Sequence, residues 1–200
     1  MLKAVRELVR RDADLGTAVE RHGPPPLWAR EPGFPTLVLL VLEQQVSLAS
    51  ARAAFDRLVA VTGPPTPDSV LRLDDAELRT IGFSRQKAGY TRVLAQALLG
   101  GSLDLDELAT LPDDEVRASL TRLRGIGPWT ADVYLTMALR RPDVFPTGDL
   151  ALLAAAQRVK RLPARPTPLE LEALAEAWRP HRATAARILW HSYLSDRARS

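Results

Sequence analysis

The sequence predicts an all-α protein built from many short helices. Apolar residues recur mostly at helical spacing, and no run alternates apolar and polar residues clearly enough to predict a β-strand. Proline and glycine interrupt the pattern repeatedly, as in Gly23–Pro26 and Gly63–Pro65. Helices are expected near residues 2–10, 13–21, 36–45, 47–61, 67–72, 74–80, 85–99, 113–122, 128–140, 149–160, 168–177 and 181–195.

Two of these helices begin after residues that suit a helix N-terminus. Ser47 is expected to cap the helix that continues from residue 48, and Ser84 the helix at 85–99, because a short hydroxyl side chain accepts a hydrogen bond from a first-turn N–H group. Arg85 and Lys87 follow Ser84 and place positive charge beside those N–H groups.

Length and composition bound the class of protein. The 200 residues can form one domain or two small ones, and 46% hydrophobic with 26% charged residues fits a globular protein. The longest apolar run, Leu37–Leu42, is too short to cross a bilayer, and charges throughout residues 1–22 argue against a signal peptide. We therefore expect a cytoplasmic protein, nucleoid-associated if bacterial, with no membrane partner.

The polar composition narrows the chemistry further. The chain contains no cysteine, which excludes disulfides, iron–sulfur clusters and thiolate zinc sites, and its three histidines have no metal-ligand spacing. The formal net charge is +3, and nearly all the cations are arginines, which bind phosphate in a bidentate manner. This charge is compatible with a nucleic-acid partner; a codon bias toward arginine is the alternative explanation.

The stretch LRGIGPWTAD, residues 123–132, joins two predicted helices. The first, Leu111–Leu123, is amphipathic, and the second begins at Pro128, which suits a first helical position. In the turn between them, Ile126 is expected to point inward, while Gly125 and Gly127 keep side chains away and leave backbone N–H groups facing an anion at a helix N-terminus. The alternative is a tight turn in which glycine serves geometry alone.

A second stretch, DVFPTGDLAL, follows the second of these helices. Its Pro/Gly loop brings Asp149 to the start of another helix, 22 residues after Gly127. A helix cap is one explanation for this aspartate.

The hairpin, the Pro/Gly loop and the aspartate together resemble the base-excision DNA glycosylase superfamily named for these features. Two further blocks agree: LEQQVSLASA (residues 42–51) resembles the family's glutamine-rich junction, and IGFSRQKAGYTRVLAQAL (81–98) resembles the stretch before the hairpin. The resemblance runs in one order from about residue 32 to 195, and the bacterial 3-methyladenine DNA glycosylase II group is most similar. The chain is too short for the extra N-terminal β-domain of some members, so it resembles a compact form.

The resemblance implies a two-lobed fold with the active site in the cleft between the lobes. One lobe would be residues 36–138, and the other would combine 1–35 with 139–200. Asp149 would be the catalytic residue in the hydrolysis of the N-glycosidic bond of alkylated purines, 3-methyladenine and 7-methylguanine, in duplex DNA after base flipping. Strand-cutting relatives carry a lysine where this chain has Trp129, so the resemblance implies a monofunctional enzyme.

The base pocket would involve Trp129, Trp190 and Tyr134. An electron-rich indole attracts a cationic alkylated base by about 0.5–2 kcal/mol. A member of the resembled group has a tyrosine in its base pocket at the position of Val133 in this chain, and Tyr134 lies beside that position. This difference leaves the substrate range open. Packing in a core is the alternative for both tryptophans.

DNA contacts follow from the same resemblance. Gln45, with Gln44, would plug the gap left by the flipped base; a polar helix end is the alternative. Phosphates would be bound by Gly125, Gly127, Thr130, Arg124, Ser84, Arg85 and Lys87. The carbonyls of Thr121, Leu123 and Ile126 correspond to those that hold an alkali cation, Na⁺ or K⁺, in the family.

The expected partner is damaged double-stranded DNA, bound by a monomer that requires no cofactor and no nucleotide. Two rivals stay open: a glycosylase for a deaminated or oxidised base, and a structure-specific DNA-binding protein without catalytic activity.

Overall fold

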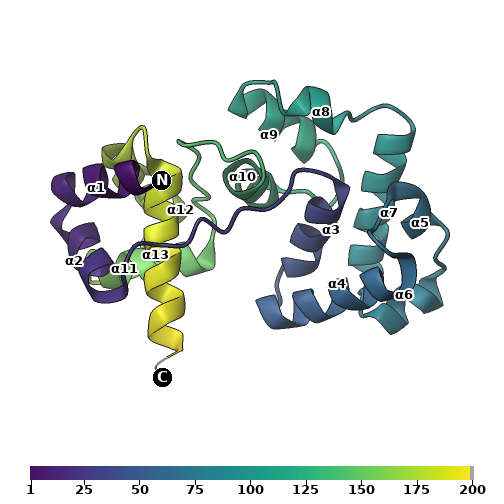
Figure 1. The fold of residues 1–200 in the computed structure, drawn as a ribbon, viewed down its shortest axis with the longest axis horizontal. Coiled ribbons are helices and arrows are strands. Elements are labelled where there is room, and N and C mark those ends of the chain that lie inside the picture. Colours follow the sequence, from purple (N-terminus) through teal and green to yellow (C-terminus); the bar gives the residue numbers. More distant parts are fainter. Residues whose placement is uncertain (199–200) are drawn as a thin grey trace. The chain divides into compact units, whose positions relative to one another are not determined.

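The prediction of an all-α fold is confirmed. The computed structural model describes residues 1–198, and these residues form thirteen α-helices, one 3-10 helix and no β-strand. None of these helices has both the length and the apolar character needed to span a bilayer. The elements, shown in Figure 1, are α1 (Leu2–Arg11), α2 (Ala13–His22), α3 (Phe34–Glu43), α4 (Leu48–Thr62), α5 (Pro67–Leu71), α6 (Asp75–Ile81), α7 (Arg85–Leu99), α8 (Leu105–Leu108), α9 (Asp113–Thr121), α10 (Pro128–Met137), α11 (Leu150–Val159), α12 (Pro168–Ala175), η1 (Glu176–Trp178) and α13 (Arg182–Arg197).

The chain divides into two compact units. Unit 1 combines Met1–Ala29 with the chain from Arg140 onward, and unit 2 is the continuous segment Arg30–Leu139. Unit 1 therefore contains α1, α2 and α11 to α13 with η1, whereas unit 2 contains α3 to α10. Each unit has its own set of buried apolar side chains, so each is described separately.

Unit 2 is built around α3. Seven of the ten residues of this helix are buried, and it packs against α4, α7 and α10. A helix that is apolar on nearly all sides is expected in the centre of a core rather than on its surface. The end of α3 is therefore held in place on several sides, and the glutamine junction, residues 42–51, begins there.

The two helices of the predicted hairpin also lie in unit 2 and pack against each other. On α9, Val116 and Leu120 are fully buried, and Ile126 in the turn points inward as expected. Arg117 Nε donates to Asp132 Oδ1 across the pair at 2.7 Å. Burial and this ion pair fix the turn between α9 and α10.

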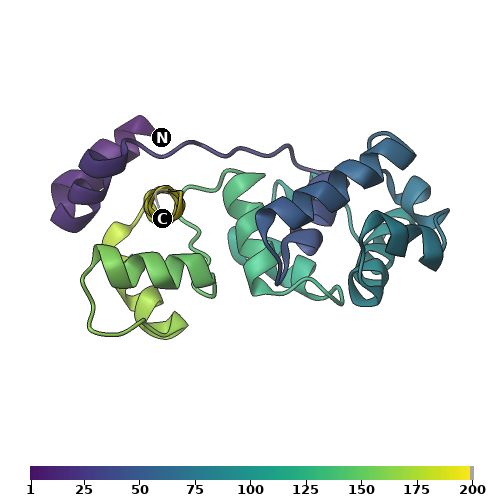
Figure 2. The ribbon, with the colours of Figure 1, turned by 90° about the horizontal axis from the view of Figure 1, so that it is seen from below.

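Unit 1 is organised around α13, which packs against α2 and α11. Figure 2 views α13 end-on, with α11 lying across it. Buried Arg187 of α13 donates to the carbonyls of Leu27 (2.8 Å) and Ala183 (3.0 Å), and burial lowers the pKa of its guanidinium group. These contacts fix the part of α13 that precedes Trp190.

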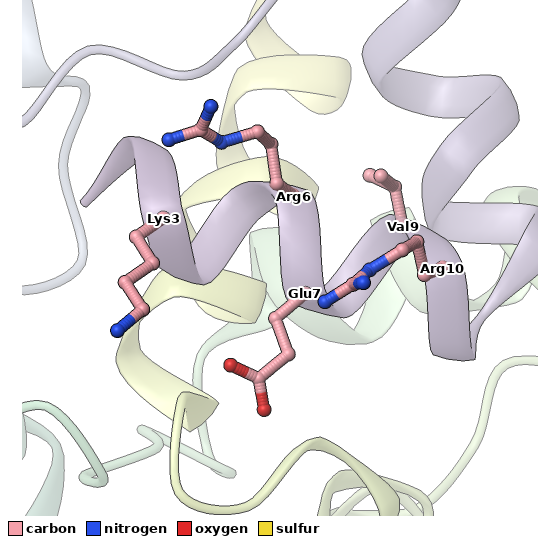
Figure 3. Close-up of a pocket in the computed structure, with 5 residues that line it drawn as sticks. All are labelled: Lys3, Arg6, Glu7, Val9 and Arg10. Atoms are coloured by element: carbon pink, nitrogen blue, oxygen red, sulfur yellow. The ribbon is translucent and has the colours of Figure 1, made fainter.

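Helix α1 packs on α2 through its apolar face and presents charge on the other. Val5 and Leu8 are buried, whereas the outward face carries basic side chains. Figure 3 shows a shallow pocket on this helix, lined by Lys3, Arg6, Glu7, Val9 and Arg10.

Asp12, between α1 and α2, ties the N-terminal helices to the rest of unit 1. Its carboxylate accepts hydrogen bonds from the N–H groups of Asp14 and Leu15, from Lys160 Nζ and from Trp178 Nε1, at 2.8–3.2 Å. Burial raises the pKa of Asp12, but the bonds from Trp178, Lys160 and Leu15 outweigh burial and hold this pKa below its usual range.

We expect Asp12→Ala to lower the free energy of unfolding by about 2–3 kcal/mol, because it removes a helix cap and leaves the buried indole N–H without its acceptor. The depressed pKa means that Asp12 stabilises the fold fully above its unfolded pKa of about 4, and that this contribution is lost as pH falls through the folded pKa. Urea unfolding of both proteins at pH 7 and pH 3 measures this; a gap that does not narrow at pH 3 would contradict it. Asp104 caps α8 by accepting two backbone N–H groups and no side-chain donor, so Asp104→Ala is the control.

Most helices begin and end within a few residues of the predicted bounds, and the exceptions have local causes. Helix α8 was not predicted, because four residues are too few to show a helical period. The predicted helix at 36–45 ends at Glu43, and the one at 128–140 ends at Met137. The first hairpin helix covers Asp113–Thr121 only, not Leu111–Leu123.

Candidate active site

The Pro/Gly loop before α11 is anchored at both ends within unit 1. Near its start, Arg182 donates from Nε to Asp143 Oδ1 (3.0 Å) and from Nη2 to the Asp143 carbonyl (2.7 Å). In its middle, buried Phe145 lies against Trp178, with ring centroids 5.6 Å apart. The N–H of Asp149 donates to the Pro146 carbonyl at 3.0 Å and closes the loop. The loop therefore holds Asp149 in a defined position.

Asp149 is the N-cap of α11. Its Oδ1 accepts the N–H of Leu152 at 2.9 Å and the indole N–H of Trp190 at 3.2 Å. The residue is only 9% exposed and Trp190 only 7%, so both bonds lie in a largely dry environment. Asp149 therefore does cap α11, as the alternative explanation holds. Capping does not account for the second donor, the indole N–H of Trp190 on α13.

Trp190 is thus placed beside Asp149 by the fold. The 41 residues that separate them are bridged because α11 packs on α13. The sequence suggested Trp190 as a base-stacking residue, and gave no signal that its N–H would orient the carboxylate. The position of a donor on a different helix depends on helix packing, which a single sequence does not reveal.

The turn of the hairpin requires glycine at one of its two glycine positions. Gly125 has φ +98°, and a Cβ built on it would lie 2.0 Å from Cγ of Tyr90, which projects from α7. Tyr90 therefore packs directly on the turn. Gly127, in contrast, has an ordinary extended conformation (φ −92°), and a Cβ there would meet no atom within 4 Å.

The N-terminus of α10 has the features expected for an anion site. Gly127 is its N-cap and provides no side chain to cap it, and Pro128 occupies its first turn. The Thr130 side chain is buried and its Oγ1 accepts a bond from Gln44 Nε2 at 3.0 Å, so the Thr130 hydroxyl is engaged inside unit 2. Arg124 is exposed in the turn. Contact of Thr130 with phosphate would therefore involve its backbone N–H.

The carbonyls suggested for an alkali cation lie in the same turn. The Leu123 carbonyl accepts the N–H of Ile126 at 3.0 Å, which leaves this oxygen one further lone pair. Thr121 donates its hydroxyl to the Arg117 carbonyl at 2.8 Å and so fixes the last turn of α9. Within residues 1–198, no group of three or more His, Asp or Glu side chains is placed to hold a metal ion.

The two glutamines of the junction differ completely in their surroundings. Gln44 Nε2 donates to the Gly125 carbonyl (2.9 Å) as well as to Thr130 Oγ1, so its side chain is directed at the hairpin. Gln45 is exposed and has φ +58°, a left-handed conformation that is uncommon for any residue other than glycine. Val46 and Leu48 next to it are also exposed and form an apolar surface that was not predicted from the sequence.

The basic residues near α7 are also not equivalent. Ser84 caps α7, as expected, by accepting the N–H of Lys87. Lys87 Nζ donates to the Leu42 carbonyl at 2.6 Å, and burial lowers the pKa of this amine. Arg85 is exposed at the first position of the helix. The side chain of Lys87 therefore supports the end of α3, and Arg85 is the better placed of the two for a phosphate.

Two of the three residues predicted for the base pocket, Trp129 and Tyr134, lie on α10, as does Val133, which stands at the position of the family's pocket tyrosine. Trp129 is partly exposed, in the first turn. Tyr134 is fully buried, and its hydroxyl accepts the N–H of Gly33 at 3.1 Å. Val133 is buried as well. Stacking on a base requires an accessible ring face, and the ring of Tyr134 has none. Tyr134 is therefore a core residue of unit 2.

Comparison with known proteins identifies the family of the chain. Residues 38–180 match the family described as HhH-GPD superfamily base excision DNA repair protein. DNA-3-methyladenine glycosylase 1 of Schizosaccharomyces pombe is 33% identical over 84% of this chain and 75% of its own length. The Bacillus subtilis protein YfjP is 31% identical over 89% of this chain. The match covers 65% of the length of YfjP.

A solved structure is similar over nearly the whole chain. The S. pombe 3-methyladenine DNA glycosylase in complex with abasic DNA matches with a TM-score of 0.89 at 30% identity, covering 94% of this chain and 95% of the other. The all-helical fold, the glycine hairpin and the aspartate-bearing loop define the class of helix-hairpin-helix DNA glycosylases. The chain belongs to the HhH-GPD superfamily and, within it, to the 3-methyladenine DNA glycosylase group.

Proposed function

We propose that this protein is a monofunctional DNA glycosylase that hydrolyses the N-glycosidic bond of alkylated purines, 3-methyladenine and 7-methylguanine, in duplex DNA. The observation that carries the proposal is Asp149: a nearly buried carboxylate at a helix N-terminus, oriented by the Trp190 indole N–H, in a chain of this family. The buried indole N–H of Trp190 needs an acceptor, and the fold supplies the carboxylate of the Pro/Gly loop for this purpose, which fixes the orientation of Asp149.

Asp149 acts on charge at the sugar. As the C1′–N bond breaks, the base leaves with the bonding electron pair and the sugar becomes oxocarbenium-like. A carboxylate fixed beforehand by two donors stabilises this charge without reorganising. The cationic purine leaves as a neutral base, and water then adds to C1′ and gives up its proton to the solvent. Alkylation at N3 or N7 makes the purine cationic and a good leaving group, so the reaction does not need a separate acid on the base.

Trp129 and the surroundings of Lys160 support hydrolysis without strand cleavage. Trp129 stands at the position of the lysine of strand-cutting relatives, where its indole can stack on a cationic base. Burial lowers the pKa of Lys160, but hydrogen bonds with Asp14 and Asp12 outweigh burial and raise this pKa overall, which disfavours the neutral amine that a Schiff base requires. Burial lowers the pKa of Lys87, but this residue does not stand at the lysine position of those relatives, and its Nζ is directed at the Leu42 carbonyl.

DNA binding is assigned to the surface of the hairpin and of the junction. Phosphates would be bound by the backbone N–H groups of Gly125, Gly127 and Thr130 and by the side chains of Arg124 and Arg85. Exposed Gln45 would enter the gap left by the flipped base, with Val46 and Leu48 as apolar neighbours against the minor groove. Na⁺ or K⁺ at the carbonyls of the turn would add positive charge beside the phosphate.

We expect Gly127→Ala to weaken binding to duplex DNA without altering stability. The added methyl group meets no atom of the protein and the φ of −92° is accessible to alanine, so the group would project only toward a phosphate. Displacing one phosphate from the helix N-terminus, which carries about half a positive charge, should raise Kd at every salt concentration and reduce the slope of log Kd against log salt by less than about 0.9. Fluorescence anisotropy between 50 and 200 mM salt measures Kd and its slope, and a Kd unchanged at every salt concentration would remove Gly127 from the phosphate site.

The rival functions are separated by a panel of duplexes that each carry one lesion. Release of 7-methylguanine with no release of uracil, hypoxanthine or 8-oxoguanine supports the proposal. Release of a deaminated or oxidised base alone supports the first rival. Tight binding of the duplexes with no release of any base supports the non-catalytic rival.

A further inference from the structure

Gln44 is not available to enter DNA in the way first expected of both junction glutamines. Both hydrogens of its Nε2 amide are used within unit 2, one to the Gly125 carbonyl at 2.9 Å and one to Thr130 Oγ1 at 3.0 Å. One acceptor lies in the turn of the hairpin, and the other lies in the first turn of α10. A single side chain thus connects the end of α3 to both parts of the predicted phosphate site.

The residues directly before Gln45 are each held by a different part of unit 2. The Leu42 carbonyl accepts Lys87 Nζ from α7, and the Glu43 carboxylate receives two bonds from Arg30, at 2.8 and 2.9 Å. Gln44 is held by the hairpin. Gln45 follows with its left-handed backbone and exposed side chain. The strained conformation of Gln45 therefore begins where the fixed segment ends, and such conformations persist only when their surroundings hold them.

We propose that Gln44 is a positioning residue that couples phosphate binding at the hairpin to insertion of Gln45 into the duplex. The coupling rests on the proposed function, since it assigns a duplex to the hairpin and a flipped base to the junction. When a phosphate fixes the turn and the N-terminus of α10, the amide of Gln44 fixes the backbone that presents Gln45. Binding at one surface thereby determines the position of the side chain at the other.

The chemistry of the contact explains why glutamine suits this position. Its planar amide supplies two N–H donors in a fixed arrangement, which matches a carbonyl and a hydroxyl oxygen. Glutamate has the same shape but no donor, so it loses the bond to the Gly125 carbonyl and places its charge against that oxygen; only the Thr130 hydroxyl can still donate to it. Methionine has a similar length and makes neither bond. Both variants therefore break the link to the turn of the hairpin while nearly preserving the volume of the side chain.

The test uses a duplex that contains a stable abasic-site analogue with 2-aminopurine beside it, because 2-aminopurine fluoresces when it is unstacked. At saturating protein, we expect Gln44→Glu and Gln44→Met to reduce the fluorescence increase about tenfold, because methionine loses two hydrogen bonds of ordinary strength and glutamate loses one and places its charge against the Gly125 carbonyl. Thr130→Val, which removes one acceptor, should give an intermediate loss of about threefold. Gln96→Glu, at an exposed position of α7, is the control and should match the wild type.

Comparison with Gln45→Ala distinguishes positioning from general damage to the fold. If Gln44 acts through Gln45, the double variant Gln44→Met/Gln45→Ala loses no more of the signal than Gln45→Ala alone, and thermal unfolding midpoints stay within a few degrees. A wild-type signal in both Gln44 variants, or losses that add fully in the double variant, would overturn the coupling. A wild-type protein that binds this duplex without unstacking it would instead defeat the proposed function.

Discussion

Asp149→Asn is expected to reduce the release of alkylated purines by about 10²–10³-fold while DNA binding is retained. Asparagine is as good a helix cap as aspartate, so it can keep the bond from the Leu152 N–H, and its Oδ1 can still accept the Trp190 N–H. The substitution therefore removes the negative charge and little else. Single-turnover excision of 7-methylguanine, with protein in excess over DNA, measures the effect on the chemical step.

A matched control isolates the charge of Asp149. Asp74→Asn makes the same change at the N-cap of α6, and its excision rate should stay within about twofold of the wild type because surface changes of this kind have small effects. Release by Asp149→Asn at the wild-type rate would mean that Asp149 is a helix cap and no more. Loss of release together with loss of DNA binding would indicate damage to the fold of the loop.

Gly125→Ala is expected to lower the free energy of unfolding by about 2–5 kcal/mol. A left-handed backbone costs an L-residue about 1–2 kcal/mol, and forcing the new Cβ against the Tyr90 ring, 2.0 Å away, adds about 1–3 kcal/mol. Urea denaturation followed by circular dichroism measures the change. Gly127→Ala is the comparison, because the two glycines are two residues apart and only Gly125 is required by the fold. We expect a large loss of stability at Gly125 and none at Gly127.

A double-mutant cycle separates the two costs at Gly125. Tyr90→Ala removes the ring that the new methyl group would meet, so Gly125→Ala should cost about 1–3 kcal/mol less in the Tyr90→Ala background than in the wild type. The cost of the left-handed backbone should remain. Fully additive effects would show that Tyr90 does not press on the turn.

The fold could be predicted from sequence to the extent that local patterns determine it. The helical period and the capping residues place most helices, as Ser47 and Ser84 illustrate. The predicted helix ends were least accurate where an apolar run passed directly into a functional segment, as at Glu43 and Met137. At both places apolar residues continue past the last helical residue, so the period alone overestimates the length of the helix.

The candidate site could be predicted one residue at a time but not as a set of contacts. Resemblance to the family pointed to Asp149 and to the hairpin. It could not indicate that Trp190 donates to Asp149, that Gln44 is bonded to the hairpin, or that Tyr90 makes glycine necessary at position 125. Each of these contacts joins residues at least 35 positions apart, and each depends on how helices pack. The resemblance predicted that Gln44 and Gln45 act together on DNA. In the structure, the backbone directs Gln44 to the hairpin and leaves Gln45 exposed.

The most direct test of the central claim is to incubate the protein with methylated duplex DNA, identify the released bases by mass spectrometry, and then examine the strand with and without alkali. We expect free 3-methyladenine and 7-methylguanine, and a strand that breaks only after alkali treatment. Release of neither base would contradict the proposed substrate. Strand cleavage in step with base release and without alkali would contradict the monofunctional mechanism that Trp129 and the raised pKa of Lys160 support.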